Sequence, residues 1–494
     1  MIGWLRRHPV AAFLPFQALM YFWNLGLLSP WGDEAYSFQT MRLPVPEILR
    51  LLAHDVHPPL YYLLLYGWLR VPLGLSWEVQ ARALSGICVL AATVAADRWW
   101  ARRLGERGRL CFLAIWAASP CLVLYARICH SFCLQLLLGT VVAGLVLRFA
   151  EGRSWRNGVW LAAGLTAALY THYVPGIALA AAANLWLLSK KRLRDAVILD
   201  TAVGVAYLPW LWWLLRALGE WGSRPPSYFF TGGALTETPI KLAYWAMSFV
   251  LGEAQPDWAM VAGAGLMALV GVLAVMGARR NRQVAWLAAV LAAIGFIGVA
   301  RWVSYPFIPA RLLFVYPLLL VLFVEGAMAH RRAGAVAVAG LLILAVTGIW
   351  SYSHQAGYRN QQYVMPIREI AAEIDRQSAE NSVVLVDTPN SDFVALRYCL
   401  GPGRRVLETR EATAGPAMEA AIADPTVRTI WFLRSPHDVT PEQLDQRFEA
   451  QLRAAMAAKA EWFGPFSPLE RRALGALGME RPPQYFQELL KFER

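Results

Sequence analysis

Long apolar stretches recur along the first 350 residues, and short polar turns separate them. A helix needs about 20 mostly apolar residues to cross a membrane, and eleven stretches come close to this length. They are residues 10–28, 79–97, 110–126, 131–149, 157–173, 174–188, 196–216, 258–278, 284–303, 309–329 and 333–351. The first follows two arginines, as a signal peptide would, but no small-x-small cleavage site comes after it. The pattern predicts an α-helical polytopic membrane protein with about 11 transmembrane helices.

The apolar stretch PPLYYLLLYGWLRVPL at residues 58–73 decides the topology, because every later loop changes sides if it crosses the membrane. Cytoplasmic loops carry an excess of Lys and Arg. If the stretch does not cross, 19 basic residues fall on one side: Arg6, Arg7, Arg98, Arg102, Arg103, Arg107, Arg109, Arg148, Arg153, Arg156, Lys190, Lys191, Arg192, Arg194, Arg279, Arg280, Arg282, Arg331 and Arg332. We therefore predict juxtamembrane helices in the first outer loop of a multi-pass protein of the inner (plasma) membrane, with a cytoplasmic N-terminus.

The pattern changes after residue 354. The runs SVVLVD (382–387) and VRTIWFLR (427–434) are rich in strand-forming residues, whereas residues 366–379 and 440–459 have helical spacing. Residues 355–494 are therefore predicted to form a small C-terminal extracytoplasmic α/β domain, which follows a transmembrane domain of residues 1–354.

Composition supports this division. Charged residues make up only 16% of the chain and the mean hydropathy is +0.40, whereas a soluble protein carries about 25% charged residues. This composition argues against an ordinary cytosolic enzyme. The isoelectric point near 9.6 would suit a nucleic-acid-binding protein, but the basic excess lies between the apolar stretches, where membrane topology accounts for it. We predict membrane lipid, and no nucleic acid, as a partner.

Two adjacent carboxylates, Asp33 and Glu34, follow the first span directly in the motif SPWGDEAYS. Neighbouring carboxylates raise each other's pKa, and partial burial at a membrane boundary raises it further. A raised pKa is what a general base for a hydroxyl group requires. The alternative interpretation is structural: Asp33 caps the next helix and Glu34 lies at its favourable N-terminal end.

A second polar cluster is the segment HDVHPPLYY, which contains His54, Asp55, His57 and Tyr61. Two prolines set the chain direction just before an apolar run, and a helix N-terminus beside imidazole groups favours a phosphate. Two alternatives stay open: a metal site formed by His54, Asp55 and His57, and interfacial anchoring by the tyrosines.

Further polar residues face the same side under the predicted topology. Tyr125 and His130 end the third span, and His172 with Tyr173 forms the turn between the fifth and sixth spans. Arg311 lies about one turn inside the tenth span, where a charge is costly and indicates a partner such as a phosphate. A histidine in such a turn is also a common structural hydrogen-bonding group. The gathering of these groups on one face predicts a site there.

At these residues the sequence resembles the GT-C membrane glycosyltransferases. The segments WGDE, DVHPPLYYLLL, YTHY and IPARLLFVYPLLL carry the resemblance. More narrowly, the chain is similar to family 39, which includes the RgtA/B/C/D-like enzymes, the protein O-mannosyltransferases and the aminoarabinose transferases of lipid A. Residues 1–354 would then form a GT-C transmembrane catalytic domain.

The resemblance implies an inverting transferase with a sugar on a polyprenyl phosphate as donor and a glycan or glycolipid hydroxyl of the cell envelope as acceptor. Asp33 matches the catalytic acid and Glu34 its neighbour. His57 and Arg311 match positions that meet the donor phosphate. The substrate-binding candidates are His54, Asp55, Tyr61, Tyr125, His130, His172 and Tyr173. The relatives mostly need no metal, so we expect neither a metal nor a cofactor.

One segment departs from the family pattern. Relatives carry a segment of the type YSQEARMY after the third span, and this chain has YARICHSF instead. Ile128 replaces the acid, His130 replaces the arginine and Phe132 replaces the second tyrosine. The identity of the donor sugar and of the acceptor is therefore open. The alternative functions are a protein O-mannosyltransferase, a transporter and a non-catalytic assembly subunit.

Overall fold

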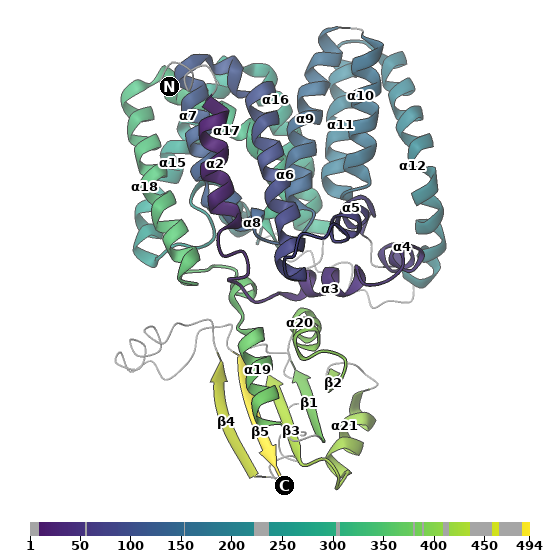
Figure 1. Cartoon of the computed structure of the whole chain (residues 1–494). Helices are drawn as coiled ribbons and strands as arrows, with labels where there is room; N and C mark the ends of the chain where they lie inside the picture. Colours follow the sequence, from purple (N-terminus) through teal and green to yellow (C-terminus); the bar gives the residue numbers. More distant parts are fainter. Residues whose placement is uncertain are drawn as a thin grey trace. The chain divides into compact units, whose positions relative to one another are not determined.

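The computed structural model describes residues 9–54, 57–152, 154–221, 237–302, 307–378, 381–387, 390–408, 414–434, 457–463 and 487–494 (Figure 1). The chain divides into two compact units. The first comprises Met1–Leu25 and Met41–Trp350, and the second comprises Gly26–Thr40 and Ser351–Arg494. The short segment Gly26–Thr40 therefore belongs with the C-terminal part of the chain, although the sequence pattern suggests that it belongs to the membrane domain.

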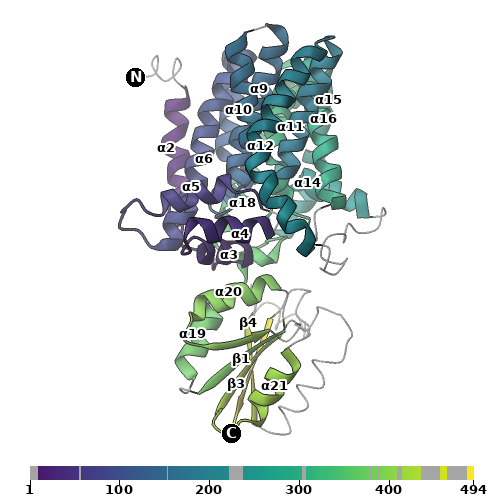
Figure 2. The ribbon, with the colours of Figure 1, turned by 90° about the vertical axis from the view of Figure 1, so that its right-hand side faces the viewer.

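The first unit is a bundle of helices. In chain order it contains α2 (Pro9–Phe22), α4 (Val45–His54), α5 (Leu60–Trp68), α6 (Trp77–Trp99), η1 (Ala101–Leu104), α7 (Gly105–Ala118), α8 (Pro120–Ala126), α9 (Phe132–Glu151), α10 (Trp155–Leu169), α11 (Tyr173–Ser189), α12 (Leu193–Trp221), α14 (Thr238–Val250), α15 (Asp257–Arg280), α16 (Arg282–Ile297), the π-helical turn η3 (Gly298–Trp302), η4 (Pro309–Val315), α17 (Tyr316–Ala329) and α18 (Arg331–Ser353). The long helices run side by side (Figures 1 and 2).

This unit makes the chain a multi-pass membrane protein, as predicted. In the described part of the chain, seven helical stretches are long and apolar enough to cross a membrane: Trp77–Trp99, Phe132–Glu151, Leu193–Ala217, Asp257–Arg280, Arg282–Ala300, Pro309–Ala329 and Arg331–Ser353. The pair α7 and α8, bent by 50°, makes an eighth if it crosses as one span. The predicted count of about 11 would also need α2, α10 and α11, which have only 14, 15 and 17 residues, and it stays a prediction.

The ambiguous stretch at residues 58–73 does not form a span. Its helix, α5, has nine residues and is therefore only about 14 Å long at 1.5 Å per residue. Helix α4 has ten residues, and both short helices lie across the bundle direction at one end of the unit (Figures 1 and 2). The prediction of short helices in this loop is confirmed, and their place beside the membrane surface stays a prediction.

The second unit is a small α/β fold. A five-stranded sheet has the order β2-β1-β3-β5-β4, and β1 pairs in parallel with both β2 and β3. The strands are β1 (Ser382–Asp387), β2 (Arg405–Glu408), β3 (Thr429–Arg434), β4 (Ala457–Phe463) and β5 (Gln487–Glu493). The helical elements are α3 (Gly32–Thr40), η5 (Gln361–Val364), α19 (Ile367–Gln377), α20 (Asn390–Leu400) and α21 (Ala414–Ala423).

Both faces of this sheet are covered, because side chains alternate along each strand. Val384 and Val386 of β1 pack in one core with residues of α19 and α20. Val383 and Leu385 pack in a second core with residues of α21 (Figure 2). A central strand buried on both faces is continuously apolar, which explains the run SVVLVD.

The helix predicted at residues 440–459 is wrong for its last residues. Residues 440–459 have helical spacing in the sequence, but residues 457–459 belong to strand β4, which pairs with β5. Residues 440–456 lie outside the described part of the chain. The backbone hydrogen bonds to β5 override the local helical pattern.

Candidate active site

Four of the predicted site residues of the first unit lie where helices begin. His57 precedes α5, His130 precedes α9, His172 is the N-cap residue of α11, and Arg311 lies in the first turn of η4. The first backbone N–H groups of a helix have no partner within the helix and carry partial positive charge. Such helix starts are therefore suited to binding an anion.

Contacts between the helices bring these four residues together. The His57 ring centroid lies 6.5 Å from that of His130. The backbone N–H of Leu60, at the start of α5, donates to the carbonyl oxygen of Tyr170, two residues before His172, at 2.8 Å. Helix α9 and η4 also pack closely, since a Cβ atom on Gly139 would lie 2.5 Å from the Cβ of Phe314. The charge of Arg311 acts on the rings of both His130 and His172, which places it in the same group.

Two histidines of this group, the buried His130 and the half-buried His172, are neutral. Burial lowers the pKa of His172 to about 3, and the charges of Arg311 and His57 act in the same direction. Burial also lowers the pKa of His130 well below its usual range, with further contributions from His57, Arg311 and His172. At neutral pH the permanent charge of the group is therefore carried by Arg311, while His130 and His172 act as neutral hydrogen-bonding groups.

The hydrogen bonds of His172 indicate its tautomer. Its Nδ1 accepts from the backbone N–H of Val174 at 3.2 Å, which closes the first turn of α11 as an N-cap does. We therefore assign the proton of the neutral ring to Nε2. The structural role of this histidine and a role as a donor to a ligand are thus compatible, because they use different ring nitrogens.

The other predicted residues of this unit have varied surroundings. The Tyr61 hydroxyl is buried, 3.4 Å from the Cys129 sulfur. The Tyr173 hydroxyl accepts a hydrogen bond from Trp210 Nε1 at 3.0 Å, and His54 is the last residue of α4. Asp55 lies outside the described residues, and within those described ranges no group of three His, Cys, Asp or Glu side chains is placed to hold a metal.

Asp33 and Glu34 belong to the second unit. Both lie in the first turn of α3, which begins at Gly32. Asp33 is half-buried and Glu34 is buried. The carbonyl oxygen of Asp33 accepts a hydrogen bond from the Ser37 hydroxyl at 2.8 Å. Asp33 lies one residue inside α3 and not at the N-cap position that the structural interpretation gave it. The first turn of a helix favours carboxylates electrostatically, so the place of both side chains is compatible with a favourable helix end and with a catalytic role.

A buried carboxylate that the sequence did not single out is Glu253, in the loop between α14 and α15. It accepts hydrogen bonds from Tyr125, from Ser248 at 2.9 Å and from Tyr244 at 2.7 Å. Burial raises the pKa of Glu253, and the three hydroxyl groups act in the opposite direction. The predicted substrate-binding residue Tyr125 is therefore held by this carboxylate. The sequence signal for this carboxylate was an acid among apolar residues, in FVLGEAQP.

Arg127, in the same departing segment as His130, has a structural environment. Its guanidinium donates to the carbonyl oxygens of Met20, Trp23 and Asn24 at 2.9, 2.6 and 2.6 Å. Met20 lies in the last turn of α2, where carbonyl groups have no partner within the helix, and Trp23 and Asn24 follow the helix directly. Arg127 therefore fixes the point at which the chain leaves α2.

Solved structures with the same architecture identify the fold. ArnT from Cupriavidus metallidurans, in the apo state, matches with a TM-score of 0.59 at 12% identity, covering 99% of this chain and 98% of that chain. Its structure bound to undecaprenyl phosphate matches with a TM-score of 0.57 at the same identity and coverage. The Archaeoglobus fulgidus oligosaccharyltransferase, in complex with Zn and sulfate, matches with a TM-score of 0.50 at 12% identity, covering 86% of this chain and 67% of that chain. This chain has the GT-C fold.

The GT-C resemblance predicted from the sequence is thus confirmed for the fold. No protein-family profile matches the sequence, and no curated protein is similar to it at a significant level. The narrower assignment to family 39 stays a prediction. Because unrelated activities share folds, the reaction has to be argued from the site.

Proposed function

We propose that the protein is an inverting glycosyltransferase. It moves a sugar from a polyprenyl-phosphate-linked donor to a hydroxyl group of a cell-envelope glycan or glycolipid, at the outer face of the membrane. The observation that carries the proposal is the group formed by Arg311, His57, His130 and His172 at four helix starts, which suits a phosphate. The GT-C fold, which ArnT has in its complex with undecaprenyl phosphate, supports it.

The reaction needs a base and a stabilised leaving group. Asp33 takes the proton of the acceptor hydroxyl. The acceptor oxygen bonds to the anomeric carbon on the face opposite the phosphate, and the bond between that carbon and the phosphate oxygen breaks. The electron pair stays on the phosphate, so polyprenyl phosphate leaves and the anomeric configuration inverts. Arg311 and the three histidines stabilise the charge that develops on the phosphate.

The remaining predicted residues take supporting roles in this proposal. Glu34 assists the base or orients the acceptor. The substrate-binding residues are His54, Asp55, Tyr61, Tyr125 and Tyr173, which would contact the sugar or the acceptor. This reaction needs neither a cofactor nor a metal ion to balance.

The deciding experiment measures release of polyprenyl phosphate by the purified protein, with a panel of polyprenyl-phosphate sugars as donors and cell-envelope lipids as acceptors. Asp33→Asn should lower kcat by about 10²- to 10⁴-fold, the usual contribution of a general base. Glu47→Gln is the matched control, because Glu47 is an exposed carboxylate in the first turn of another helix, α4. It should leave kcat unchanged.

The phosphate half of the proposal is tested separately with Arg311→Gln. Loss of a charged hydrogen-bonding group should raise the KM for the donor by about 10- to 100-fold. Near-normal transfer by Asp33→Asn would remove Asp33 from the base role. No release with any donor of the panel, in the presence of correctly folded protein, would contradict the transferase proposal and favour the transporter or the non-catalytic subunit. Transfer to a polypeptide alone would favour a protein O-mannosyltransferase.

A further inference from the structure

The helix that carries Asp33 and Glu34 is built into the core of the C-terminal α/β unit. The segment Gly26–Thr40 and residues 351–494 form one compact unit. Ala35, next to the two carboxylates, is completely buried in a core cluster that also contains Ile370 of α19 and Leu396 of α20. The backbone of α3 is therefore fixed by residues that come more than 300 positions later in the sequence.

The chain leading into α3 is held by the start of α19. The Arg368 guanidinium donates to the carbonyl oxygens of Gly26 at 3.2 Å and of Leu28 at 3.4 Å. The Arg368 backbone N–H donates to the Ser29 hydroxyl oxygen at 3.3 Å, and this hydroxyl donates to Glu369 at 3.1 Å. The N-cap residue of α19 is Pro366, which provides no side-chain cap. Ser29 therefore supplies the acceptor that an N-cap side chain normally offers.

Aromatic contacts flank the two carboxylates along the chain. The Trp31 ring meets the Tyr363 ring edge-on, with centroids 5.3 Å apart. The Phe38 ring lies against the Tyr398 ring of α20, with centroids 5.4 Å apart. These contacts involve residues before and after Asp33 in the sequence. They therefore limit movement of the first turn of α3.

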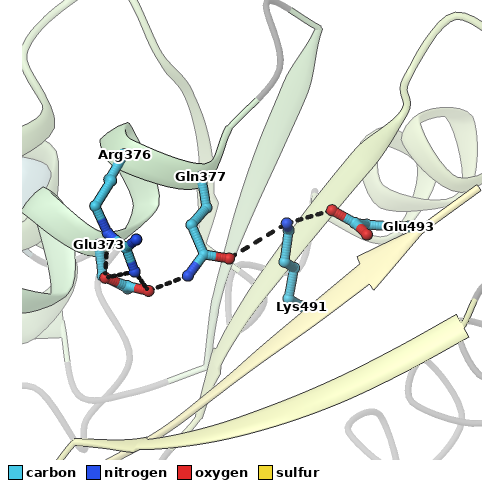
Figure 3. A network of polar contacts seen from close by, with 5 residues as sticks. All are labelled: Glu373, Arg376, Gln377, Lys491 and Glu493. Carbon is cyan, nitrogen blue, oxygen red and sulfur yellow. Dashed lines mark hydrogen bonds and ion pairs between the residues drawn. The ribbon is translucent and has the colours of Figure 1, made fainter.

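Helix α19 is in turn attached to the sheet at its other end. Lys491 of β5 donates to the Gln377 side-chain oxygen at 3.4 Å, and it also pairs with Glu493 (Figure 3). The Trp431 indole N–H of β3 donates to the Ser378 hydroxyl, which follows α19 directly, at 2.9 Å. Helix α19 therefore connects the sheet to the segment before α3.

We propose that the C-terminal α/β domain positions the catalytic carboxylates, and that Arg368 and Ser29 are positioning residues for Asp33. This inference rests on the proposed function. It assigns the domain a role in catalysis through α3: the sheet holds α19, α19 holds residues 26–29, and these set where α3 begins. A base displaced by about 1 Å can cost about 100-fold in rate, so loosening this connection affects the chemical step.

The test compares Arg368→Met with Arg376→Met in the full-length protein. Both arginines lie on α19, but Arg376 is 68% exposed and pairs with Glu373 of the same helix (Figure 3). Arg368→Met should lower kcat by about 10- to 100-fold with the donor KM within twofold of wild type. Arg368→Lys should recover part of the loss, and Arg376→Met should match wild type. Amide hydrogen exchange of residues 34–40 should become faster in Arg368→Met only.

The outcomes separate this inference from the proposed function. If Asp33→Asn is inactive but Arg368→Met has normal kcat and normal exchange in α3, the positioning role is wrong and the transferase proposal stands. If Arg376→Met loses as much kcat as Arg368→Met, the effect is general destabilisation and the role is also wrong. Activity of Asp33→Asn would instead contradict the proposed function. Should Arg368→Met fail to fold, Ser29→Ala, which removes one hydroxyl, carries the same expectations.

Discussion

The histidine that begins α11 exemplifies how burial decides the chemistry of a single side chain. His172 lies beside Arg311 and His57, and a proton on its ring would be both desolvated and repelled. The same applies to His130, which replaces the arginine of the family pattern that the sequence resembles. The sequence indicated less charge at that position, and the lowered pKa of His130 means that it contributes no charge at neutral pH.

This environment predicts a pH dependence of stability. The pKa of His172 is about 3 in the folded protein and about 6.5 in an unfolded chain. Between these values the unfolded state binds the extra proton, so stability falls as the pH is lowered from about 6.5 towards 3. At pH 5 the loss from His172 is on the order of 1–2 kcal/mol.

The measurement is the melting temperature in detergent at pH 7.5 and pH 5. His172→Asn keeps a good N-cap acceptor and has no titrating group, so its melting temperature should fall less on acidification than that of the wild type. His330→Asn is the control, since His330 is an exposed histidine in the turn between α17 and α18, and it should behave as wild type. An equal fall in His172→Asn and wild type would contradict the lowered pKa.

At the scale of elements, α17 depends on glycine contacts with α15. A Cβ atom on Gly277 of α15 would overlap the carbonyl oxygen of Leu322, and one on Gly326 of α17 would overlap that of Leu273. Small residues at both positions let the two backbones approach closely, as in other membrane helix pairs. Helix α17 continues η4, so this contact also supports the element that carries Arg311.

Gly277→Ala should therefore separate α15 from α17 and destabilise the protein by about 1–3 kcal/mol, the usual cost of overpacking. The matched control is Gly271→Ala on the same helix, where an added Cβ has open space; it should change stability by less than about 0.5 kcal/mol. Thermal unfolding in detergent measures both variants. Equal melting temperatures would show that the helices do not pack at Gly277.

The elements differ in how far the sequence predicted them. Each predicted span has a helix at its place, because long apolar runs leave few alternatives in lipid. The bend between α7 and α8 was not predicted, although Pro120 starts the second helix and Ser119 caps it. Helix α14 was also missed, because at 13 residues it falls below the length of a span.

The candidate site was predictable only in part. Histidines and arginines near helix ends were visible in the sequence, and the topology indicated that they share one face. Glu253 was missed because of where its hydroxyl partners lie in the sequence. Tyr125 of α8 is far from it along the chain, and Tyr244 of α14 belongs to no motif. Likewise, no local pattern relates Ala35 to the core that α19 and α20 form.

At the scale of the whole molecule, the orientation in the membrane stays a prediction that a labelling experiment can test. Lys190 lies in a basic turn predicted to be cytoplasmic, and Gly403 lies in the domain predicted to be outside; both are exposed. In a background in which the six native cysteines are replaced by alanine, a membrane-impermeant maleimide on intact cells should label Gly403→Cys and should not label Lys190→Cys. Both should be labelled after permeabilisation. Labelling of Lys190→Cys in intact cells would reverse the topology.

Ser29 and Glu369 are in contact although 340 positions separate them in the sequence. The ribosome therefore makes them at different times. A ribosome adding about 5–20 residues per second needs about 20–70 seconds to make that length of chain. During this interval the helix with Asp33 and Glu34 has been synthesised, while the helix that holds its start has not. The proposed catalytic geometry therefore arises late in biosynthesis, after the membrane helices have been made.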